Sequence, residues 1–516
     1  MNSEILKVIR ERGLLLEKEI FDLLKSFNNV GLARDFLEGL ERFSGQKIIT
    51  KSTLNKNFEY VQSVVKNLPG DNRSTIENIF VKLGLSLEIR KEKGVIEQGI
   101  DAGKKNSSFQ ISCADTSVGK KLEVSDFVGN FRSRYQQIQK ILMSRPELQQ
   151  NLVSIGKISN NRQSLALIGI VSEKRVTKNK NIIIKFEDLT GEISGIAKLQ
   201  NEELFKKAEE LMLDDIVGVR ASGNRDMLFV QDIFYPDAFV HEKARFEEDV
   251  SIAFISDIHC GSMMHLGESF EKFISWLNSG DESAKKIRYL FLVGDTVDGI
   301  GIYPGQESFL ALKSLKEQYE LLASYLRKVP KHITMFHCPG NHDASRVAQP
   351  QPPVSEYYAA SLYEIDNLVM VTNPTIVRLF EGNKEFKVLL YHGGSVHCFI
   401  NAIPELREMK AHHSPAKVVR HMLKRRHLDP LHSSAIYIPN AHKDPLVINE
   451  IPDLLATGEV HKVDIENYNG ILIITSGCWQ SKTPFEEKVG NEPDPAKVPV
   501  FNLKTRELKI FDFSGG

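Results

Sequence analysis

The sequence is poor in cysteine and has no long apolar run. Its 516 residues include five widely spaced cysteines and no CxxC pair (Cys113, Cys260, Cys338, Cys398, Cys478). Because the cysteines are few and odd in number, they exclude a disulfide scaffold, and without a CxxC pair a zinc knuckle is not expected. Such sparse cysteine usage fits a reducing compartment, so we expect a cytoplasmic protein. Apolar runs such as 290–293 are far shorter than the ~20 residues that span a membrane. The N-terminal stretch shows no apolar core of a signal peptide.

The sequence also lacks an excess of either charge. Lysine and arginine number 66 and aspartate and glutamate 67, which gives a net charge of −1. A globally basic nucleic-acid-binding protein is therefore not indicated, and any contact with a polyanion must be local. The hydrophobic content of 41% is typical of a globular protein. The length predicts roughly three domains.

The N-terminal part reads as helical. Apolar residues recur at roughly helical spacing over residues 1–80, which predicts a helical domain. This domain either docks on a partner or packs only on itself, and both alternatives stay open. Residues 81–130 are polar, with mixed charges and few aromatics. We expect a linker there, which need not be ordered.

Residues 131–245 predict a helix followed by a small β-barrel. The helix covers 131–143, and five strands with a helix (202–212) after the third have the order of an OB-fold. The predicted strands are 165–171, 181–187, 192–197, 216–220 and 227–230. OB-folds often bind single strands through basic grooves and aromatic stacking. Phe186 and Phe229 also fit a core, so nucleic-acid contact and a structural or docking barrel both stay open.

Residues 246–516 predict an α/β sandwich, so the whole chain is expected to be a multidomain α/β protein. Near-continuous apolar strands alternate here with helical segments, as buried strands do. These strands include 252–255, 289–293, 333–336, 388–391 and 471–474.

Five of the strands in this region are followed by potential metal ligands. The segments are Asp257-Ile258-His259, Gly294-Asp295-Thr296-Val297-Asp298, Gly340-Asn341-His342-Asp343, His392 and Gly458-Glu459-Val460-His461. Ligands gather beyond the carboxyl ends of strands in open α/β sheets, so we expect these side chains to meet. In Asp257-x-His259, an extended chain would point both side chains to one side. One Asp-x-His alone is usually a surface feature or a helix cap, whereas five such segments in order are not.

The donor types indicate the metal. Carboxylate and amide oxygens with imidazoles suit Mn, Mg, Fe or Zn, and the absence of cysteine argues against a soft site. A two-metal centre needs a bridging ligand, and Asp295 is the best candidate because it is central in the series.

These five segments resemble the motifs of the calcineurin-like metallophosphoesterases. The resemblance implies one metal held by Asp257, His259, Asp295 and His461, and a second held by Asp295, Asn341, His392 and the position of Glu459. It further implies that His342 stabilises or protonates the leaving oxygen, with Asp343 orienting it, while Asp298 supports the ligands from behind. The family usually has histidine in place of Glu459, and this departure puts the second site in question.

The domain order narrows the resemblance. A phosphoesterase domain behind a helical domain and an OB-fold is similar to the small (B) subunits of replicative DNA polymerases. The retained ligands, and the segment 422–430, resemble the small-subunit family of archaeal family D DNA polymerases. This implies a 3′–5′ proofreading exonuclease with two divalent ions, Mn or Mg, with Fe or Zn as alternatives. The implied partners are DNA and a large catalytic polymerase subunit, and a sliding clamp is a further candidate.

Two alternatives to this function stay open. One is a structural subunit with a vestigial site, and the other is a different phosphoesterase, such as a protein phosphatase or a cyclic-nucleotide enzyme. A basic run predicts DNA contact at Lys424, Arg425 and Arg426. The alternatives for that run are a solvated helix face or a face docked on an acidic patch of the large subunit.

Overall fold

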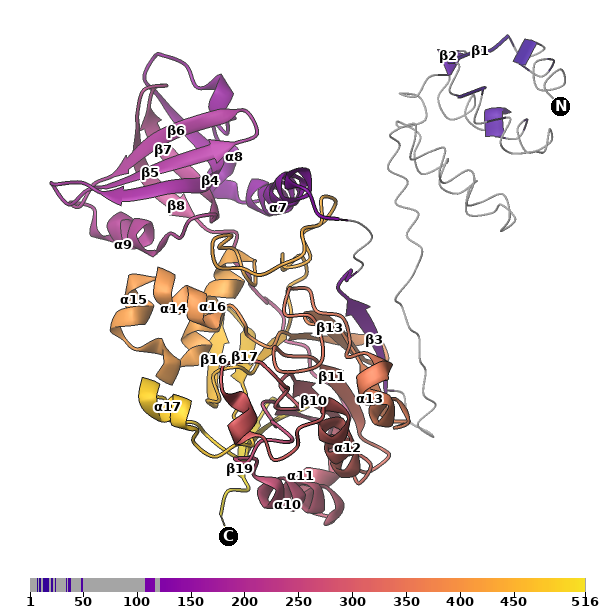
Figure 1. Cartoon of the computed structure of the whole chain (residues 1–516). Helices are drawn as coiled ribbons and strands as arrows, with labels where there is room; N and C mark the ends of the chain where they lie inside the picture. The colour runs from indigo at the N-terminus through magenta and orange to yellow at the C-terminus, as the bar shows by residue number, and fades with distance from the viewer. Residues whose placement is uncertain are drawn as a thin grey trace. The chain divides into compact units, whose positions relative to one another are not determined.

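The computed structural model describes residues 107–116 and 121–515, with scattered positions between 7 and 49 (Figure 1). The chain divides into two compact units, Met1–Lys93 and Gly94–Gly516. In the first unit, β1 (Leu15–Leu16) and β2 (Ile48–Ile49) pair in parallel. Most of the predicted helical domain and residues 81–106 of the predicted linker lie outside the described residues.

The predicted linker includes a strand of the main sheet system. β3 (Ser107–Cys113) pairs antiparallel with β13 (Thr375–Glu381). The expectation of a linker throughout 81–130 is therefore wrong for this segment. Polar residues dominate β3, but Ile111 is buried in the core between the sheets and Phe109 packs against it. α7 (Val124–Met143) begins earlier than the predicted helix at 131.

The second unit contains a closed five-stranded barrel with the strand order β4-β5-β6-β8-β7. Its strands are β4 (Gln163–Val176), β5 (Ile182–Asp188), β6 (Gly191–Ala197), β7 (Ile216–Gly223) and β8 (Leu228–Phe234). α9 (Glu202–Glu210) follows the third strand, as the sequence predicts. Phe186 lies fully buried in the barrel core, and a Cβ added at Gly195 would lie 3.1 Å from its ring. Phe186 therefore has a packing role.

Two six-stranded sheets follow, which confirms the predicted α/β sandwich. One has the order β12-β11-β10-β9-β18-β19 and the other β16-β17-β15-β14-β13-β3. The first sheet comprises β9 (Ser251–Ile255), β10 (Ile287–Val293), β11 (Thr334–Cys338), β12 (Leu368–Met370), β18 (Lys497–Asn502) and β19 (Leu508–Asp512). The second adds β14 (Lys384–Leu390), β15 (Leu454–Thr457), β16 (Asp464–Tyr468) and β17 (Ile471–Thr475) to β13 and β3.

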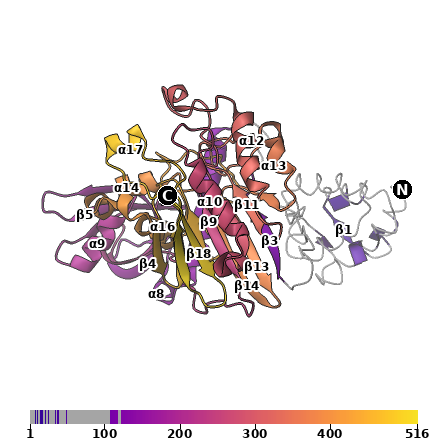
Figure 2. The same ribbon diagram turned by 90° about the horizontal axis from the view of Figure 1, so that it is seen from below.

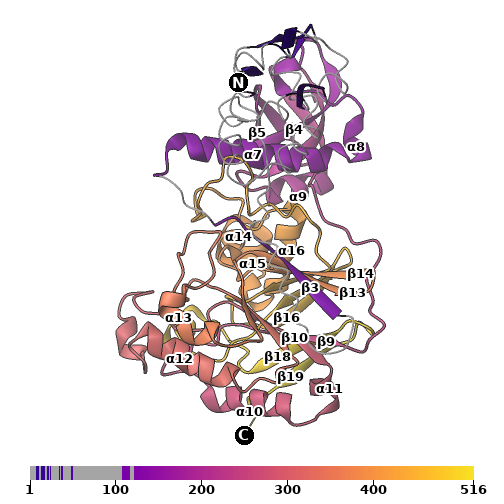
Figure 3. The same ribbon diagram turned by 90° about the vertical axis from the view of Figure 1, so that its right-hand side faces the viewer.

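Alternating side chains sort the sandwich into four layers. Phe254 and Phe291 of the first sheet share a core with Val388 and Leu390 of the second. The opposite face of the first sheet is covered by α10 (Gly267–Asn278), α12 (Leu315–Leu326) and α13 (Glu356–Tyr363). The opposite face of the second sheet is covered by α14 (Val396–Ala402), α15 (Pro404–Glu408) and α16 (Pro415–Arg425). Figures 1 and 3 show the two helix groups on opposite sides of the sheets.

Buried ion pairs join the barrel to the sandwich. Arg425, at the end of α16 and only 4% exposed, donates from Nε to Asp215 Oδ1 at 2.8 Å and from Nη2 to the Glu210 carbonyl at 2.8 Å. The Glu210 carboxylate accepts from Lys424 Nζ at 2.6 Å. Figure 2 shows α9 of the barrel beside α14 and α16. Because buried charges need partners, these pairs fix which surfaces meet.

The sequence argues against a disulfide scaffold and against a membrane-spanning helix. All five cysteines are free. None of the helices among the described residues is both long and apolar enough to cross a membrane.

The Arg425 pairs predict a large loss of stability on substitution. Arg425→Met leaves Asp215 buried without its cation, so the free energy of unfolding should fall by about 3–5 kcal/mol. Arg175→Met is the matched control, because Arg175 and Glu173 form an exposed pair at 3.9 Å, for which a loss below ~1 kcal/mol is expected. Denaturant unfolding of both variants measures the difference, and equal losses would contradict the assignment.

Candidate metal centre

The polar loops that follow five strands meet at one place. β9, β10 and β11 run parallel in the first sheet, and β14 and β15 run parallel in the second. Each is followed by one of the predicted ligand segments. Contacts between His461, after β15, and both Asp257 and His259, after β9, show that the two sheets bring their carboxyl ends together. This is the edge at which the sequence places a site.

The ligand loops use an unusual backbone conformation. Five residues have a left-handed φ, between 49° and 69°: Asp257, His259, Asp295, Glu459 and His461. The expectation that Asp257 and His259 lie on an extended chain is therefore wrong, and both side chains reach the site from a turned backbone. Non-glycine residues in sparsely populated conformations cost about 1–3 kcal/mol each and persist where the surroundings impose them. The buried strands on either side impose them here.

Glycines at this edge allow the loops to approach closely. A Cβ at Gly340 would lie 2.1 Å from Asp295 Oδ1, and one at Gly458 would lie 2.6 Å from Asp257 Oδ2. Both distances are far below van der Waals contact, so any side chain at either position would displace a predicted ligand.

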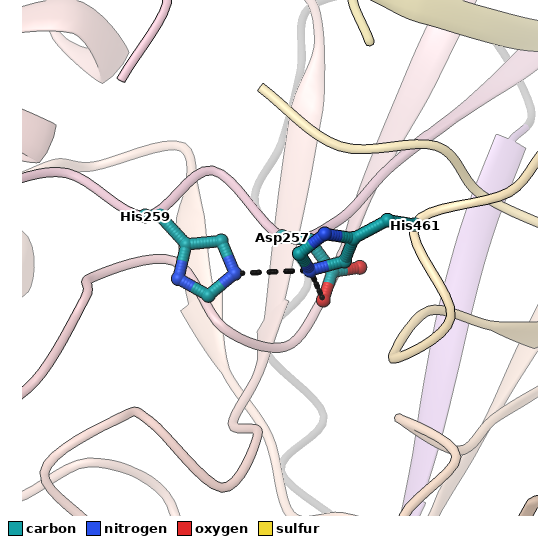
Figure 4. Close-up of side chains that lie close together, drawn as sticks. All are labelled: Asp257, His259 and His461. Atoms are coloured by element: carbon teal, nitrogen blue, oxygen red, sulfur yellow. Dashed lines mark hydrogen bonds and ion pairs between the residues drawn. The ribbon is translucent and has the colours of Figure 1, made fainter. Parts of the chain in front are cut away.

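The first ligand group consists of Asp257, His259 and His461 (Figure 4). His259 Nε2 lies 3.2 Å from His461 Nε2, which lies 3.4 Å from Asp257 Oδ1. His259 Nδ1 lies 3.1 Å from Asp298 Oδ1, and His461 Nδ1 lies 2.9 Å from Glu486 Oε1. The carboxylates assign the hydrogen of each neutral ring to Nδ1, so the two Nε2 lone pairs face each other. Burial lowers the pKa of His461, but Cys478 and Asp257 outweigh burial and raise this pKa well above its usual value. A proton on His461 or a metal cation between the two rings would relieve this repulsion.

The second group surrounds His392. Its Nδ1 donates to the Val293 carbonyl at 2.7 Å. Its Nε2 lies 3.3 Å from Asp295 Oδ2 and 3.0 Å from Glu459 Oε2. In the neutral ring Nε2 carries a lone pair, so again acceptors face acceptors and a positive charge is required.

Buried acceptor atoms without hydrogen-bond partners support the same conclusion. They include Asp257 Oδ1, Asn341 Oδ1, His392 Nε2 and Glu459 Oε2. An unsatisfied buried polar group costs about 1–3 kcal/mol, so a fold that retains four at one edge fits a cation site. Within the described residues, ligand atoms of Asp257, Asp295 and His392 lie within 4.8 Å of one another, as do those of the first group. These oxygen and imidazole donors suit divalent cations.

The electrostatics of the site favour positive charge. Burial alone lowers the pKa of an imidazole, but Asp295 and Glu459 outweigh burial and raise the pKa of His392 well above its usual value. Burial likewise raises the pKa of a carboxyl group, but His392 and His342 hold the pKa of Asp295 below its usual value. The centre therefore stabilises cations close to its carboxylates.

His342 and Asp343 are adjacent in sequence, but their side chains have different hydrogen-bond partners. His342 donates from Nδ1 to the Asp298 carbonyl at 2.7 Å, and its Nε2 lies 4.0 Å from Asp295 Oδ2. The Asp343 carboxylate accepts from Thr296 Oγ1 at 2.6 Å and from the Gly340 amide at 2.8 Å. The expectation that Asp343 orients His342 is therefore wrong. The Asp298 carbonyl orients the ring, and Asp343 braces the loops that carry the ligands.

Asp298, the residue expected to support the ligands, contacts His259 directly. Its Oδ1 lies 3.1 Å from His259 Nδ1, and its Oδ2 accepts from Gln306 Nε2 at 3.1 Å. Gln306 is fully buried, so the carboxylate is held in place from behind.

Sequence reasoning missed Glu486 and His397. Glu486 lies in α17 (Pro484–Val489), where its Oε2 accepts from the Thr483 amide at 2.8 Å while Oε1 faces His461. The Thr483-x-x-Glu486 pattern signals a capping box, but nothing in it indicates a histidine partner. His397, in α14, has Nε2 3.8 Å from Glu459 Oε1, and its sequence context carries no signal for this contact.

Two of the three predicted DNA-contacting residues lie inside the molecule, and the third, Lys424, is partly exposed. Arg425 and Arg426 are buried, and Arg426 donates to the backbone carbonyls of Ile448 and Asn449 at 2.6 and 2.8 Å. Lys424 forms the ion pair with Glu210. The prediction of DNA contact is therefore corrected, because Lys424 and Arg425 dock on acidic residues of the chain's own barrel and Arg426 binds backbone carbonyls.

The fold and site together define a two-sheet α/β protein with a candidate two-cation centre at the carboxyl edge of both sheets. Residues 252–464 match the model of the DNA polymerase alpha/epsilon B-subunit family. The chain belongs to the family of archaeal DNA polymerase II small subunits, the small subunits of archaeal family D, which confirms the resemblance seen in the sequence.

Several relatives are named DNA polymerase II small subunit, including the following three. The protein from Pyrococcus furiosus is 37% identical over 404 residues, which cover 76% of this chain and 64% of that protein. The one from Methanothermobacter thermautotrophicus is 37% identical, covering 76% of this chain and 80% of the relative. The one from Pyrococcus horikoshii is 32% identical, covering 97% and 80%. This chain thus spans somewhat less than two thirds of the Pyrococcus furiosus protein.

Two solved structures show a weak likeness to this chain. An archaeal phosphodiesterase is 12% identical with a TM-score of 0.25, covering 51% of this chain and 99% of that chain. A mutant Vps29 from Entamoeba histolytica is 17% identical with a TM-score of 0.24, covering 51% and 90%.

The facing acceptors predict strong stabilisation by divalent cations. A cation that binds only the folded protein at a hundred times its Kd should stabilise it by about 2.7 kcal/mol. We expect Mn²⁺ to raise the Tm of the metal-free protein, and His461→Ala to lose the part of this rise that comes from the first ligand group. His413→Ala is the control, because His413 is exposed. Scanning calorimetry with Mn²⁺, Mg²⁺, Zn²⁺ and Fe²⁺ measures the shift, and identical shifts in both variants would contradict a site at His461.

Proposed function

We propose that this chain is a metal-dependent 3′–5′ exonuclease that acts on DNA as the proofreading small subunit of a two-subunit replicative polymerase. The observation that carries the proposal is the set of buried acceptors that face one another without hydrogen-bond partners. Membership in a family of polymerase small subunits supports DNA as the substrate. The name "small subunit" supports a large partner, on which polymerisation would take place.

The barrel is proposed to be an OB-fold. Its closed order β4-β5-β6-β8-β7, with α9 after the third strand, supports this assignment. The domain order of the proposal is therefore a helical domain, an OB-fold and a phosphoesterase domain.

The proposed centre divides the ligands between two cations that share Asp295. One would be held by Asp257, His259, Asp295 and His461, and the other by Asp295, Asn341, His392 and Glu459. Divalent cations, Mn or Mg with Fe or Zn as alternatives, would supply Lewis acidity at the scissile phosphate and allow hydrolysis at neutral pH. Asp298 and Glu486 fix His259 and His461 so that both Nε2 atoms point into the centre.

His342 is the residue proposed to handle the proton of the leaving oxygen. Its Nδ1 is committed to the Asp298 carbonyl, so that Nε2 faces the centre next to Asp295. A proton on Nε2 can pass to the leaving 3′-oxygen when the phosphodiester bond breaks. The His342 amide also donates to Asp295 Oδ1 at 2.8 Å, which ties the position of the ring to that of the shared ligand.

A structural subunit with a weakened site is the second candidate function. Glu459 favours it, because a carboxylate stands where the resembled family has a neutral imidazole. Glu459 also lies 3.8 Å from the half-exposed His397, which offers it a partner other than a metal ion. The experiments on His342 and Glu459 separate the two candidates.

The role of His342 predicts a selective loss of rate. His342→Ala should reduce cleavage of a 3′-labelled single-stranded oligonucleotide by ~10²–10⁴-fold, because a positioned proton donor contributes that much. Metal content and DNA affinity should stay unchanged. Single-turnover assays with Mn²⁺, on the chain alone and with the co-expressed large subunit, measure the rate. Loss of a bound ion in the variant would show that His342 is a ligand instead.

Glu459 predicts a change in metal stoichiometry. Glu459→Ala should reduce the bound ions from two toward one, because an oxygen donor is removed from the second group, and Glu459→His should keep two. Glu492→Ala is the control, since Glu492 is exposed and pairs with Lys482. Elemental analysis of dialysed protein measures the ratio. Two tightly held ions in Glu459→Ala would make Glu459 a bystander and leave its pairing with His397 as its role.

A further inference from the structure

The barrel carries a hollow that belongs neither to its core nor to the metal centre. The hollow has a volume of about 540 Å³ and is lined by residues of β6, β8, the first turn of α9 and the adjoining loops. These residues include Arg162, Ile196, Lys198, Asn201, Phe229 and Gln231. The volume lies within the range of small-ligand sites, and the lining contains two cationic side chains and no carboxylate.

Phe229 is an aromatic residue at an exposed position of β8. Along β8, Leu228 and Val230 are buried, and Phe229 and Gln231 between and after them are exposed. Phe229 is 39% exposed, whereas Phe186 of the same barrel is fully buried. An aromatic ring at a position that alternation assigns to solvent gains little from packing. A ring of this kind in a hollow is suited to stack on a flat ligand.

Two cations accompany the ring. Arg162 Cζ lies 5.6 Å and Lys198 Nζ 5.4 Å from the centroid of the Phe229 ring. Within residues 121–515, neither has a carboxylate partner among the ion pairs of the structure. Other cations of the barrel do, since Lys185 pairs with Glu192 at 2.8 Å and Lys207 with Asp232 at 2.8 Å. The hollow therefore keeps two positive charges available to an anion.

We propose that this hollow binds single-stranded nucleic acid, with one base stacked on Phe229 and the flanking phosphates on Arg162 and Lys198. Stacking on an aromatic ring and contact of basic side chains with the backbone are how proteins hold single strands. The choice of DNA rests on the proposed function. The site itself shares no residue with the metal centre.

A peptide is the rival occupant, and the topology argues against it. Peptides that bind sheet proteins often add a strand to a free edge. The barrel is closed, and β6 and β8 pair in parallel at Ile196 and Phe229, next to the hollow. The edge beside Phe229 is thus already paired, which leaves the ring and the two cations as the binding features.

Anisotropy of a labelled oligothymidine tests the proposal. An oligomer of roughly 12 nucleotides lies within the site sizes of OB-folds, and EDTA excludes both cleavage and metal contacts. Phe229→Ala should weaken binding by about 5- to 150-fold, which corresponds to the loss of one stacked base. Phe229→Leu, which keeps an apolar side chain without the ring, should weaken binding comparably. The double variant Arg162→Ala/Lys198→Ala should flatten the salt dependence by up to ~1.4 log units.

Matched controls separate this site from general effects. Phe239→Ala removes another exposed ring, and Lys178→Ala/Lys206→Ala removes two exposed lysines of the same barrel that do not line the hollow. Both controls should bind as the parent does. Thermal unfolding of each variant confirms that it folds, and Phe229→Leu keeps the test valid if Phe229→Ala does not.

The outcomes are distinct. Parent-like binding by the Phe229 and double variants overturns the proposal. The proposal is also overturned if a polyglutamate peptide binds through Phe229 and the oligonucleotide does not, because the hollow is then a protein-docking site. Binding that depends on Phe229 in a protein that cleaves no DNA with any metal would uphold this site and overturn the proposed exonuclease.

Discussion

The chemistry of the centre depends on where each histidine places its one hydrogen. His259 and His461 give theirs to Asp298 and Glu486, carboxylates that lie behind the rings. Since a neutral imidazole has one hydrogen, both Nε2 atoms enter the centre as acceptors, 3.2 Å apart. Such a contact is repulsive by itself and favourable around a cation. The supporting carboxylates therefore make the two imidazoles a candidate cation site, and Glu486 does so from the capping box of α17.

The rest of the fold offsets the free-energy cost of this arrangement of ligand residues. The left-handed ligand residues, the orphaned acceptors and the crowded glycines each disfavour the folded state locally. The buried strands on both sides offset these costs, because apolar side chains fill the space between the sheets and under both helix layers. Buried arginines extend the rigidity. Arg134 in α7 donates from Nε to Asp444 Oδ2 at 2.6 Å, and Arg425 fixes the barrel in the same way.

The sequence predicts which polar loops meet, because it records where strands end and parallel strands carry their carboxyl ends to one edge. It predicts supporting residues less well, since it indicates Asp298 but not Glu486. Glu486 reaches His461 through a cap that has its own local explanation, and β3 pairs with a strand far along the chain. The basic run at 424–426 shows the limit most clearly, because a charged segment has the same pattern whether it faces solvent, DNA or a buried acid such as Asp215. Only the fold shows which of these three surroundings the charged segment has.

The internal use of cations bears on how the proposed nuclease would hold its substrate. The chain has nearly equal numbers of acids and bases, and buried arginines such as Arg425 join the barrel to the sandwich. Contact with a polyanion must then be local, and Arg162 and Lys198 beside Phe229 are cations of the barrel that no carboxylate within residues 121–515 neutralises. Stacking and phosphate contacts carry no sequence information. A proofreading enzyme must accept any sequence at a DNA end. A hollow that binds a single strand without sequence preference suits that task.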